Sequence, residues 1–182
     1  LMSKIGKKNI TVPKDSSVKS ENGVITITGP KGSKTLSIND KIFSTSVDEN
    51  NEFNIKPLGK DLDVRTSVMW GTYRSLINNA ILGVSKGHTK ILDITGVGFR
   101  ANLKGDVLNL QLGFSHDINF KIPKDIKITV EKQTSLTITG VDKELVSKVA
   151  SDIKSLKPVE PYKGKGIKER NQYVLRKEGK KK

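Results

Sequence analysis

The sequence has no cysteine, few aromatic residues and far fewer acidic than basic residues. Without cysteine the chain can form no disulfide, no thiolate metal site and no cysteine nucleophile. Its two histidines, His88 and His116, have no carboxylates spaced to complete a metal site, so we expect no bound metal. No stretch approaches the ~18 consecutive apolar residues of a membrane span, and the N-terminus lacks the apolar centre of a secretory signal. We therefore expect a soluble, intracellular protein without a membrane partner.

Positive charge is present in excess. The 182 residues include 33 Lys and Arg but only 19 Asp and Glu, which gives a formal net charge of +14. A folded chain tolerates this repulsion best when a polyanion neutralises it, so nucleic acid is the first expected partner. Residues 157–182 hold 10 of the basic and 3 of the acidic residues, and so carry half of the excess. We interpret this segment as a basic arm that lies along phosphates, in preference to a solvated tail that only aids solubility.

Two segments share a pattern that predicts a duplicated domain. Residues 12–29 read VPKDSSVKSENGVITITG, and residues 122–140 read IPKDIKITVEKQTSLTITG. Each combines a Pro-Lys-Asp turn, a strand with polar edges, and a strand in which apolar residues alternate with threonine. We expect two copies of one domain, at residues 1–82 and 83–156, followed by a basic RNA-binding tail at residues 157–182.

The hydrophobic periodicity predicts one helix in each copy. Apolar residues recur at three- and four-residue spacing over about 63–83 and 142–156. Asp63 and Asp142 can cap the two helices, and Pro158 stops the second. The expected fold class is α+β, with each copy a small, mostly antiparallel sheet covered by one helix, because the connections are too short for parallel crossovers. Short alternating runs predict strands at 24–28, 35–38, 53–56, 91–95, 99–103 and 107–112.

Two glycine motifs suggest other functions, and neither fits its local context. Gly96 to Ala101 matches the G-x-G-x-x-A pattern of dinucleotide-binding folds, which need a helix to open at the glycines. The residues that follow alternate and turn at Gly105, which predicts a hairpin instead. Gly29 to Gly32 matches the G-x-x-G loop of KH domains, but it joins two expected strands. No two carboxylates are placed for acid–base work, so we expect no enzyme, no catalytic residue and no cofactor.

The most specific stretch of the chain is Lys157 to Ile167, which reads KPVEPYKGKGI. Its two prolines favour an extended backbone. The run Lys163 to Gly166 alternates lysine with glycine, so the backbone can approach phosphates closely while the lysines supply charge. Tyr162 offers a flat face for an unpaired base or a ribose. We expect this stretch to contact RNA.

This stretch resembles the signature of the L-six family of large-subunit ribosomal proteins, which commonly reads K-P-P-E-P-Y-K-G-K-G-[IV]. The likeness covers essentially the whole chain, including SKIGKKNITVP at 3–13, the ENGVITITGPKG hairpin, GVGFRA, and RKEGKKK at 176–182. The tandem duplication is also a property of the family. Val159 stands where the family usually has proline, and Glu169 replaces a usual aromatic residue.

The resemblance implies a structural protein of the large ribosomal subunit that binds ribosomal RNA near the sarcin–ricin loop and the stalk base. It implies neighbouring large-subunit proteins as partners, translational GTPases transiently nearby, and a ribosome in a bacterial cytoplasm or a mitochondrial matrix. It also implies that the first copy contacts RNA less than the second. The alternative is a free-standing RNA-binding or RNA-chaperone protein. The residues expected to bind RNA are Lys157, Tyr162, Lys163, Gly164, Lys165, Gly166, Lys168, Arg170, Arg176, Lys177, Lys86, His88, Lys90 and Arg100.

Overall fold

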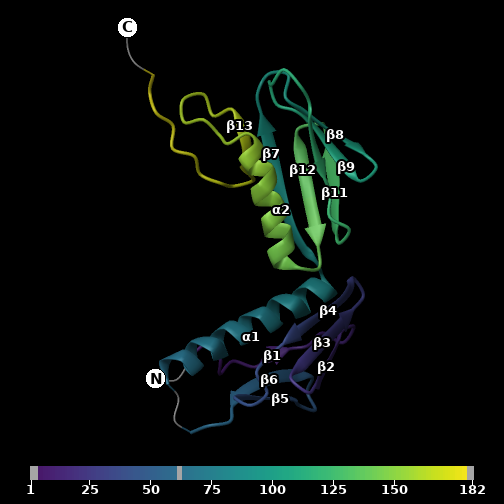
Figure 1. Ribbon diagram of the computed structural model, residues 1–182, viewed down its shortest axis with the longest axis vertical. Coiled ribbons are helices and arrows are strands. Elements are labelled where there is room, and N and C mark those ends of the chain that lie inside the picture. The colour runs from purple at the N-terminus through teal and green to yellow at the C-terminus, as the bar shows by residue number, and fades with distance from the viewer. Residues whose placement is uncertain (1–3, 61–62, 180–182) are drawn as a thin grey trace. The chain divides into compact units, whose positions relative to one another are not determined.

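The computed structural model describes residues 4–60 and 63–179 of the chain. The chain divides into two compact units (Figure 1). The first extends to Gly87 and includes Val141–Lys143, and the second comprises His88–Gly140 and the residues from Glu144 onward. Each unit contains its own cluster of buried apolar side chains. The basic ending at residues 180–182 lies outside the described residues.

The first unit consists of two antiparallel three-stranded sheets and one helix, which packs on β3, β4 and β6. The two sheets have the orders β1-β6-β5 and β2-β3-β4. The elements of this unit are β1 (Ile10–Thr11), β2 (Ser17–Glu21), β3 (Val24–Gly29), β4 (Gly32–Ser37), β5 (Phe43–Val47), β6 (Glu52–Pro57) and α1 (Val64–Ser85).

Helix α1 begins where the sequence predicts and ends two residues beyond the predicted limit, at Ser85. Asp63 caps its start, because one carboxylate oxygen accepts a 2.7 Å hydrogen bond from the backbone N–H of Thr66. Hydrogen bonding to Thr66 also lowers the pKa of the Asp63 carboxyl. Gly87, with φ +81°, follows the last turn, and the helix continues past residue 82, where we expected a domain limit. Trp70 is buried, and its indole N–H donates to the Ile55 carbonyl at 2.7 Å.

The second unit has the same kind of architecture with one strand more. A four-stranded sheet has the order β11-β12-β7-β13, and a three-stranded sheet has the order β10-β9-β8. All ladders are antiparallel, and the second helix ends before Pro158 as predicted. The elements are β7 (His88–Thr95), β8 (Arg100–Lys104), β9 (Val107–Gln111), β10 (Ile118–Lys121), β11 (Ile126–Glu131), β12 (Ser135–Gly140), α2 (Lys143–Leu156) and β13 (Gly166–Glu169).

The strand orders confirm the duplication but correct the alignment that predicted it. β1-β6-β5 corresponds to β7-β12-β11, β2-β3-β4 corresponds to β8-β9-β10, and each helix follows its β6 or β12. The expected equivalence of residues 12–29 with 122–140 is therefore wrong, because it pairs β3 with β12. Both strands are central in their sheets and bury alternate side chains, so both favour apolar residues alternating with threonine.

No strand among the described residues of the first unit, 4–60 and 63–87, corresponds to β13. It pairs with the edge of β7, with Gly166 opposite Thr95 and Glu169 opposite Leu92. The side chain of Ile167 is only 2% exposed and belongs to the apolar core of the unit. Residues 166–169, which we expected to lie in a basic tail separate from the second domain, are thus an extended strand of its sheet. The free edge of β7 supplies hydrogen-bonding groups, and burying Ile167 favours pairing over solvation.

Candidate nucleic-acid interface

The segment between α2 and β13 is a folded loop held by backbone hydrogen bonds. At its base the N–H of Ile167 donates to the carbonyl of Lys157 at 2.9 Å. Within the loop the N–H of Glu160 donates to Lys165 at 3.0 Å, and the N–H of Gly164 donates to Glu160 at 3.2 Å. These bonds fix the backbone of the loop before any ligand arrives.

Both glycines of the loop have a conformational reason to be glycine. Gly164 has φ +70° and Gly166 has φ +138°, which side chains rarely tolerate. A Cβ on Gly166 would also lie 2.6 Å from the carbonyl oxygen of Pro158, which is bridged to Ile167 beside it. The sequence suggested that the backbone at these glycines approaches phosphates. At Gly166 the backbone instead packs closely against the backbone of Pro158. Contact of either glycine with phosphate stays a prediction.

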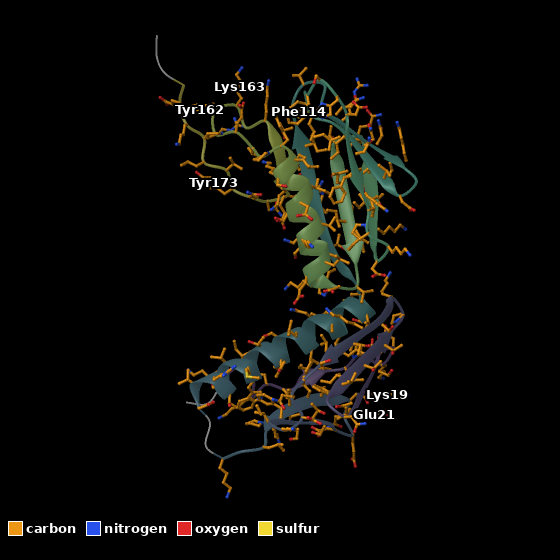
Figure 2. All side chains as sticks on the ribbon, viewed as in Figure 1. Lys19, Glu21, Phe114, Tyr162, Lys163 and Tyr173 are labelled. Atoms are coloured by element: carbon orange, nitrogen blue, oxygen red, sulfur yellow. The ribbon has the colours of Figure 1, made fainter. Side chains whose placement is uncertain are left out.

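The tip of the loop presents an aromatic ring and a cation to solvent. Tyr162 is 57% exposed and the neighbouring Lys163 is also exposed (Figure 2). Lys165 is half-buried on the return of the loop. Because the backbone beneath these side chains is fixed, they have few conformations to lose when they bind a ligand.

The end of the described chain adds two more cations to this loop. The backbone N–H of Lys177 donates to the carbonyl of Pro161 at 2.7 Å. The guanidinium of Arg176 lies beside Gly164, where an added Cβ would be 2.8 Å from Nη2. We call the group of Tyr162, Lys163, Lys165, Arg176 and Lys177 the loop-tip surface.

Glu169 binds two cations, Lys90 on β7 and Lys154 on α2, and Lys90 was expected to bind RNA. Its carboxylate lies 3.0 Å from the ammonium of Lys90 and 3.4 Å from that of Lys154. The hydrogen bond from Lys90 is the main reason that the pKa of Glu169 is below its usual value. Sequence reasoning treated Glu169 only as the loss of an aromatic residue, whereas its charge links β13 to α2 and adds to the ladder that joins it to β7. RNA binding by Lys90 would have to compete with this carboxylate.

Arg170 is engaged in a similar way at the end of β13. Its guanidinium lies 3.2 Å from one carboxylate oxygen of Asp93 and 3.1 Å from the hydroxyl of Ser135. Its backbone N–H donates to the carbonyl of Ile91 at 2.9 Å. Asp93 raises the pKa of Arg170 above its ordinary value. Lys168 lies between Glu169 and the loop and is half-buried. In the β13–β7 ladder its backbone is opposite that of Asp93.

Three other predicted RNA-binding residues lie outside the loop-tip surface. His88 begins β7 and pairs with Gly140, whereas β13 joins β7 at its other end, a strand length of about 20 Å away. Arg100 is exposed at the start of β8, in the other sheet of the unit. Lys86 caps the end of α1 and belongs to the first unit. Their contacts with RNA stay predictions.

The glycines at 96–98 form a turn, as the alternating sequence predicts. The N–H of Phe99 donates to the carbonyl of Gly96 at 3.3 Å, and strand β8 begins at the next residue. A dinucleotide site would need a helix here. Among residues 4–60 and 63–179, no three His, Cys, Asp or Glu side chains are grouped to hold a metal ion. In the same part of the chain no helix has the length and apolar character to cross a membrane.

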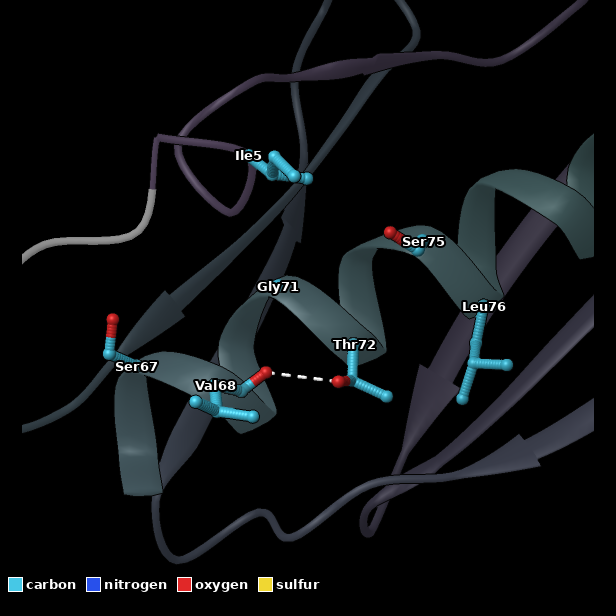
Figure 3. A pocket seen from close by; sticks show the side chains of 7 residues that line it. All are labelled: Ile5, Ser67, Val68, Gly71, Thr72, Ser75 and Leu76. Carbon is cyan, nitrogen blue, oxygen red and sulfur yellow. Dashed lines mark hydrogen bonds between the residues drawn. The ribbon is translucent and has the colours of Figure 1, made fainter. Parts of the chain in front are cut away.

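A hollow beside α1 in the first unit offers little chemistry (Figure 3). The hydroxyl of Thr72 donates to the carbonyl of Val68 at 3.0 Å. No acidic or basic side chain that the structure describes lines the hollow, so it lacks groups for acid–base work or for binding phosphate. Its lining residues are Ile5, Ser67, Val68, Gly71, Thr72, Ser75 and Leu76.

Comparison with known proteins decides the family. The family model described as Ribosomal protein L6 matches the chain twice, at residues 12–87 and 95–170. The chain belongs to the ribosomal protein L6 family. The double match agrees with the duplication seen in the strand orders. The second match extends to residue 170 and so takes in the loop and β13, which the first unit lacks.

Bacterial members of the L6 family resemble this chain along its entire length. The protein named large ribosomal subunit protein uL6 of Novosphingobium aromaticivorans is 45% identical over 181 residues, covering 100% of both chains. Proteins of the same name from Magnetococcus marinus and Sphingopyxis alaskensis are 44% and 42% identical, again over 100% of both chains. The L6 family is structural, so the expectation that the chain is not an enzyme is confirmed.

Proposed function

We propose that the chain is a structural constituent of the large ribosomal subunit that binds ribosomal RNA through the loop-tip surface. The carrying observation is that Tyr162 and Lys163 are exposed on a loop whose backbone is fixed by its own hydrogen bonds. Arg176 and Lys177 are held against the same loop. The same loop thus carries an exposed aromatic ring and two lysines and is contacted by a segment with two more cations, a combination suited to unpaired or irregular RNA.

The charges in this part of the second unit have separate roles. Lys90, Lys154 and Arg170 are paired with carboxylates of the protein and link β13 and the residue after it to β7 and α2. The cations of the loop-tip surface have no ion pair of 4.0 Å or less to a described carboxylate, so their charge is available for phosphates. A rigid body with a cationic tip fills an RNA groove without first having to order itself.

The position within the subunit is also part of the proposal. The resemblance of KPVEPYKGKGI to the family signature supports binding near the sarcin–ricin loop and the stalk base, beside the site where translational GTPases act. The named relatives support a large subunit with neighbouring ribosomal proteins, in a bacterial cytoplasm. The mitochondrial matrix is the second location that the sequence allows.

Salt dependence of binding tests the RNA contact. The full chain is titrated with an RNA fragment that contains the sarcin–ricin stem-loop, at several KCl concentrations. For about four phosphate contacts, one for each cation of the loop-tip surface, the slope of log affinity against log salt is expected near −3. The double substitution Lys163→Ala, Lys165→Ala should reduce the steepness of the slope by about 1.5. Lys19→Ala, an exposed lysine on β2 of the first unit (Figure 2), is the matched control and should leave the slope unchanged. A wild-type slope near −1 contradicts the proposal.

Sedimentation separates this proposal from a free-standing RNA chaperone. The chain, expressed with a tag in a bacterium, should migrate in a sucrose gradient with the large subunit and remain there after a high-salt wash. A chain that stays near the top of the gradient while still binding RNA in vitro would favour the chaperone.

A further inference from the structure

A pocket of about 380 Å³ opens beside the loop, between the loop and the turn that follows β9. Its size is at the lower end of the ~300–1000 Å³ of typical ligand pockets. Two aromatic rings, two lysines and one carboxylate line it, which is an unusual combination for a surface that otherwise carries mainly positive charge. The lining residues with these groups are Phe99, Phe114, Lys157, Lys165 and Glu160.

Phe99 is fixed in the pocket by two glycines. A Cβ on Gly96 would lie 2.5 Å from the Phe99 ring, and a Cβ on Gly113 would lie 2.9 Å from it. Both glycines also have positive φ angles, +155° and +78°. The GVGF motif, which resembled a dinucleotide fingerprint, thus holds an aromatic ring at the wall of a pocket.

Phe114 is the accessible ring. It is 45% exposed, although burying a phenylalanine would be favourable. The ammonium of Lys157 lies 4.7 Å from its ring centroid, and His116 lies at 6.5 Å with a tilt of 31°. The cation makes this ring a favourable platform for a π-system that is attached to phosphates.

We propose that this pocket binds one unstacked RNA base, a guanine, against Phe114. The proposal rests on the RNA-binding function proposed above and adds a base-specific subsite to it. The base lies on the exposed ring, and Lys157 and Lys165 are positioned at the pocket to neutralise the phosphates on either side of its nucleotide.

Glu160 supplies the preference for guanine. A carboxylate at an RNA-binding surface repels phosphates, but the exposed Glu160 at the wall of this pocket can accept hydrogen bonds from a base. Guanine presents its N1–H and its exocyclic amino group side by side, and a carboxylate accepts both. Adenine has an acceptor nitrogen at the first of these positions and would leave one carboxylate oxygen facing a lone pair.

Three pentaribonucleotides test the proposal with the full-length protein. They consist of uridines around a central guanosine, a central adenosine or a central abasic ribose, and binding is followed by fluorescence anisotropy at one fixed salt concentration. The guanosine probe should bind roughly tenfold more tightly than the abasic probe, as expected for one stacked base. The adenosine probe should fall between them.

Phe114→Leu should remove most of the difference between the guanosine and abasic probes while the melting temperature stays unchanged. Glu160→Gln should bring the guanosine and adenosine probes close together and leave both above the abasic probe. Tyr173→Leu, which changes an aromatic residue that is 84% exposed and outside the pocket, is the matched control and should alter none of these ratios. Lys163→Ala should weaken all three probes by the same factor.

The outcomes distinguish failure of the pocket proposal from failure of the proposed RNA-binding function. If Phe114→Leu leaves the ratios unchanged while Lys163→Ala weakens every probe, the pocket proposal is wrong and RNA binding by the loop-tip surface stands. If the wild type binds guanosine and adenosine equally, the assignment to guanine is wrong. If Lys163→Ala and Phe114→Leu both leave every affinity unchanged, the function proposed for this surface is wrong as well.

Discussion

The two units share a strand order but differ at one edge. In the first unit the sheet β1-β6-β5 ends in β1, a strand of two residues. In the second unit the corresponding β7 has eight residues and is covered by β13. A long free strand edge invites pairing with other chains, and a short one does not. In the first unit the exposed strand edge is short because β1 has only two residues. In the second unit the edge of β7 is paired with β13, a later part of the same chain.

This difference explains why the candidate interface is on only one of the two copies. The loop at 157–165 exists because β13 returns to the sheet and closes it at the Lys157–Ile167 hydrogen bond. The shared strand order gives both units the same folded framework. Only the second unit has β13, which closes the loop that carries the candidate interface. The comparison therefore predicts that β13 matters to both stability and RNA binding, whereas β1 matters to stability alone.

The largest expected effect comes from truncating a buried isoleucine on each edge strand. Ile10 in β1 is 3% exposed and Ile167 in β13 is 2% exposed. Ile10→Ala and Ile167→Ala should each lower the free energy of unfolding by about 2–4 kcal/mol, measured by chemical denaturation. Only Ile167→Ala should also weaken binding to the RNA fragment, because only β13 holds the loop.

Leu175→Ala is the control on the same terminal segment. This residue is 62% exposed and should change stability by less than about 0.5 kcal/mol. Equal loss of RNA affinity in Ile10→Ala and Ile167→Ala would break the comparison between the two edges.

A smaller effect is expected at the hinge of the loop. Gly166→Ala combines a positive φ with a Cβ placed 2.6 Å from the Pro158 carbonyl, so it should cost about 2 kcal/mol of unfolding free energy. Gly98→Ala is the matched control, since Gly98 has φ +76° but no neighbour within 4 Å of an added Cβ. It should cost only about 1 kcal/mol, from backbone strain alone. Equal costs in thermal denaturation would show that β13 can shift to accommodate the methyl group.

The smallest effect is a pH dependence due to Glu169. Its pKa is lowered from 4.5 in the folded protein by Lys90 and Lys154, so its ionised form stabilises the fold above that value. The stabilisation is lost as the pH falls through the lowered pKa. Between about pH 6 and pH 3 the wild type should lose up to about 1 kcal/mol more unfolding free energy than Glu169→Gln. Parallel pH profiles for the two proteins would show that this carboxylate does not attach β13.

The sequence predicts the parts of the fold that depend on local patterns. Asp63 at the start of α1, the stop before Pro158 and the hairpin around residues 29–32 are confirmed, since each depends on a few neighbouring residues. The strands at 43–47 and 118–121 were not predicted, because FSTSV and INFK are too short or too polar to show a clear alternation. The α+β class is confirmed because it depends on all elements together rather than on any one.

What the sequence does not predict depends on contacts between distant residues. Gly166 to Glu169 has one strongly apolar residue, so nothing local indicates a strand until β7 offers its edge. The ion pairs of Lys90 and Arg170 are equally invisible, because their partners lie 79 and 77 residues away. The misaligned repeat has the same origin: similar strands in different places of a sheet carry similar patterns. The resemblance of KPVEPYKGKGI to the family signature could be recognised because it lies in consecutive residues and does not depend on contacts between distant ones.

The late position of β13 has a consequence for synthesis of the protein. β7 lies near the middle of the chain, but the strand that completes its sheet, β13, follows α2 near the end. Until then the nascent second unit has an open edge and lacks Ile167 in its core. The loop that we assign to RNA closes only with that last strand, so an incomplete copy cannot present it. A chain that terminates before β13 therefore lacks the closed loop, and one that terminates before Lys177 lacks part of the loop-tip surface.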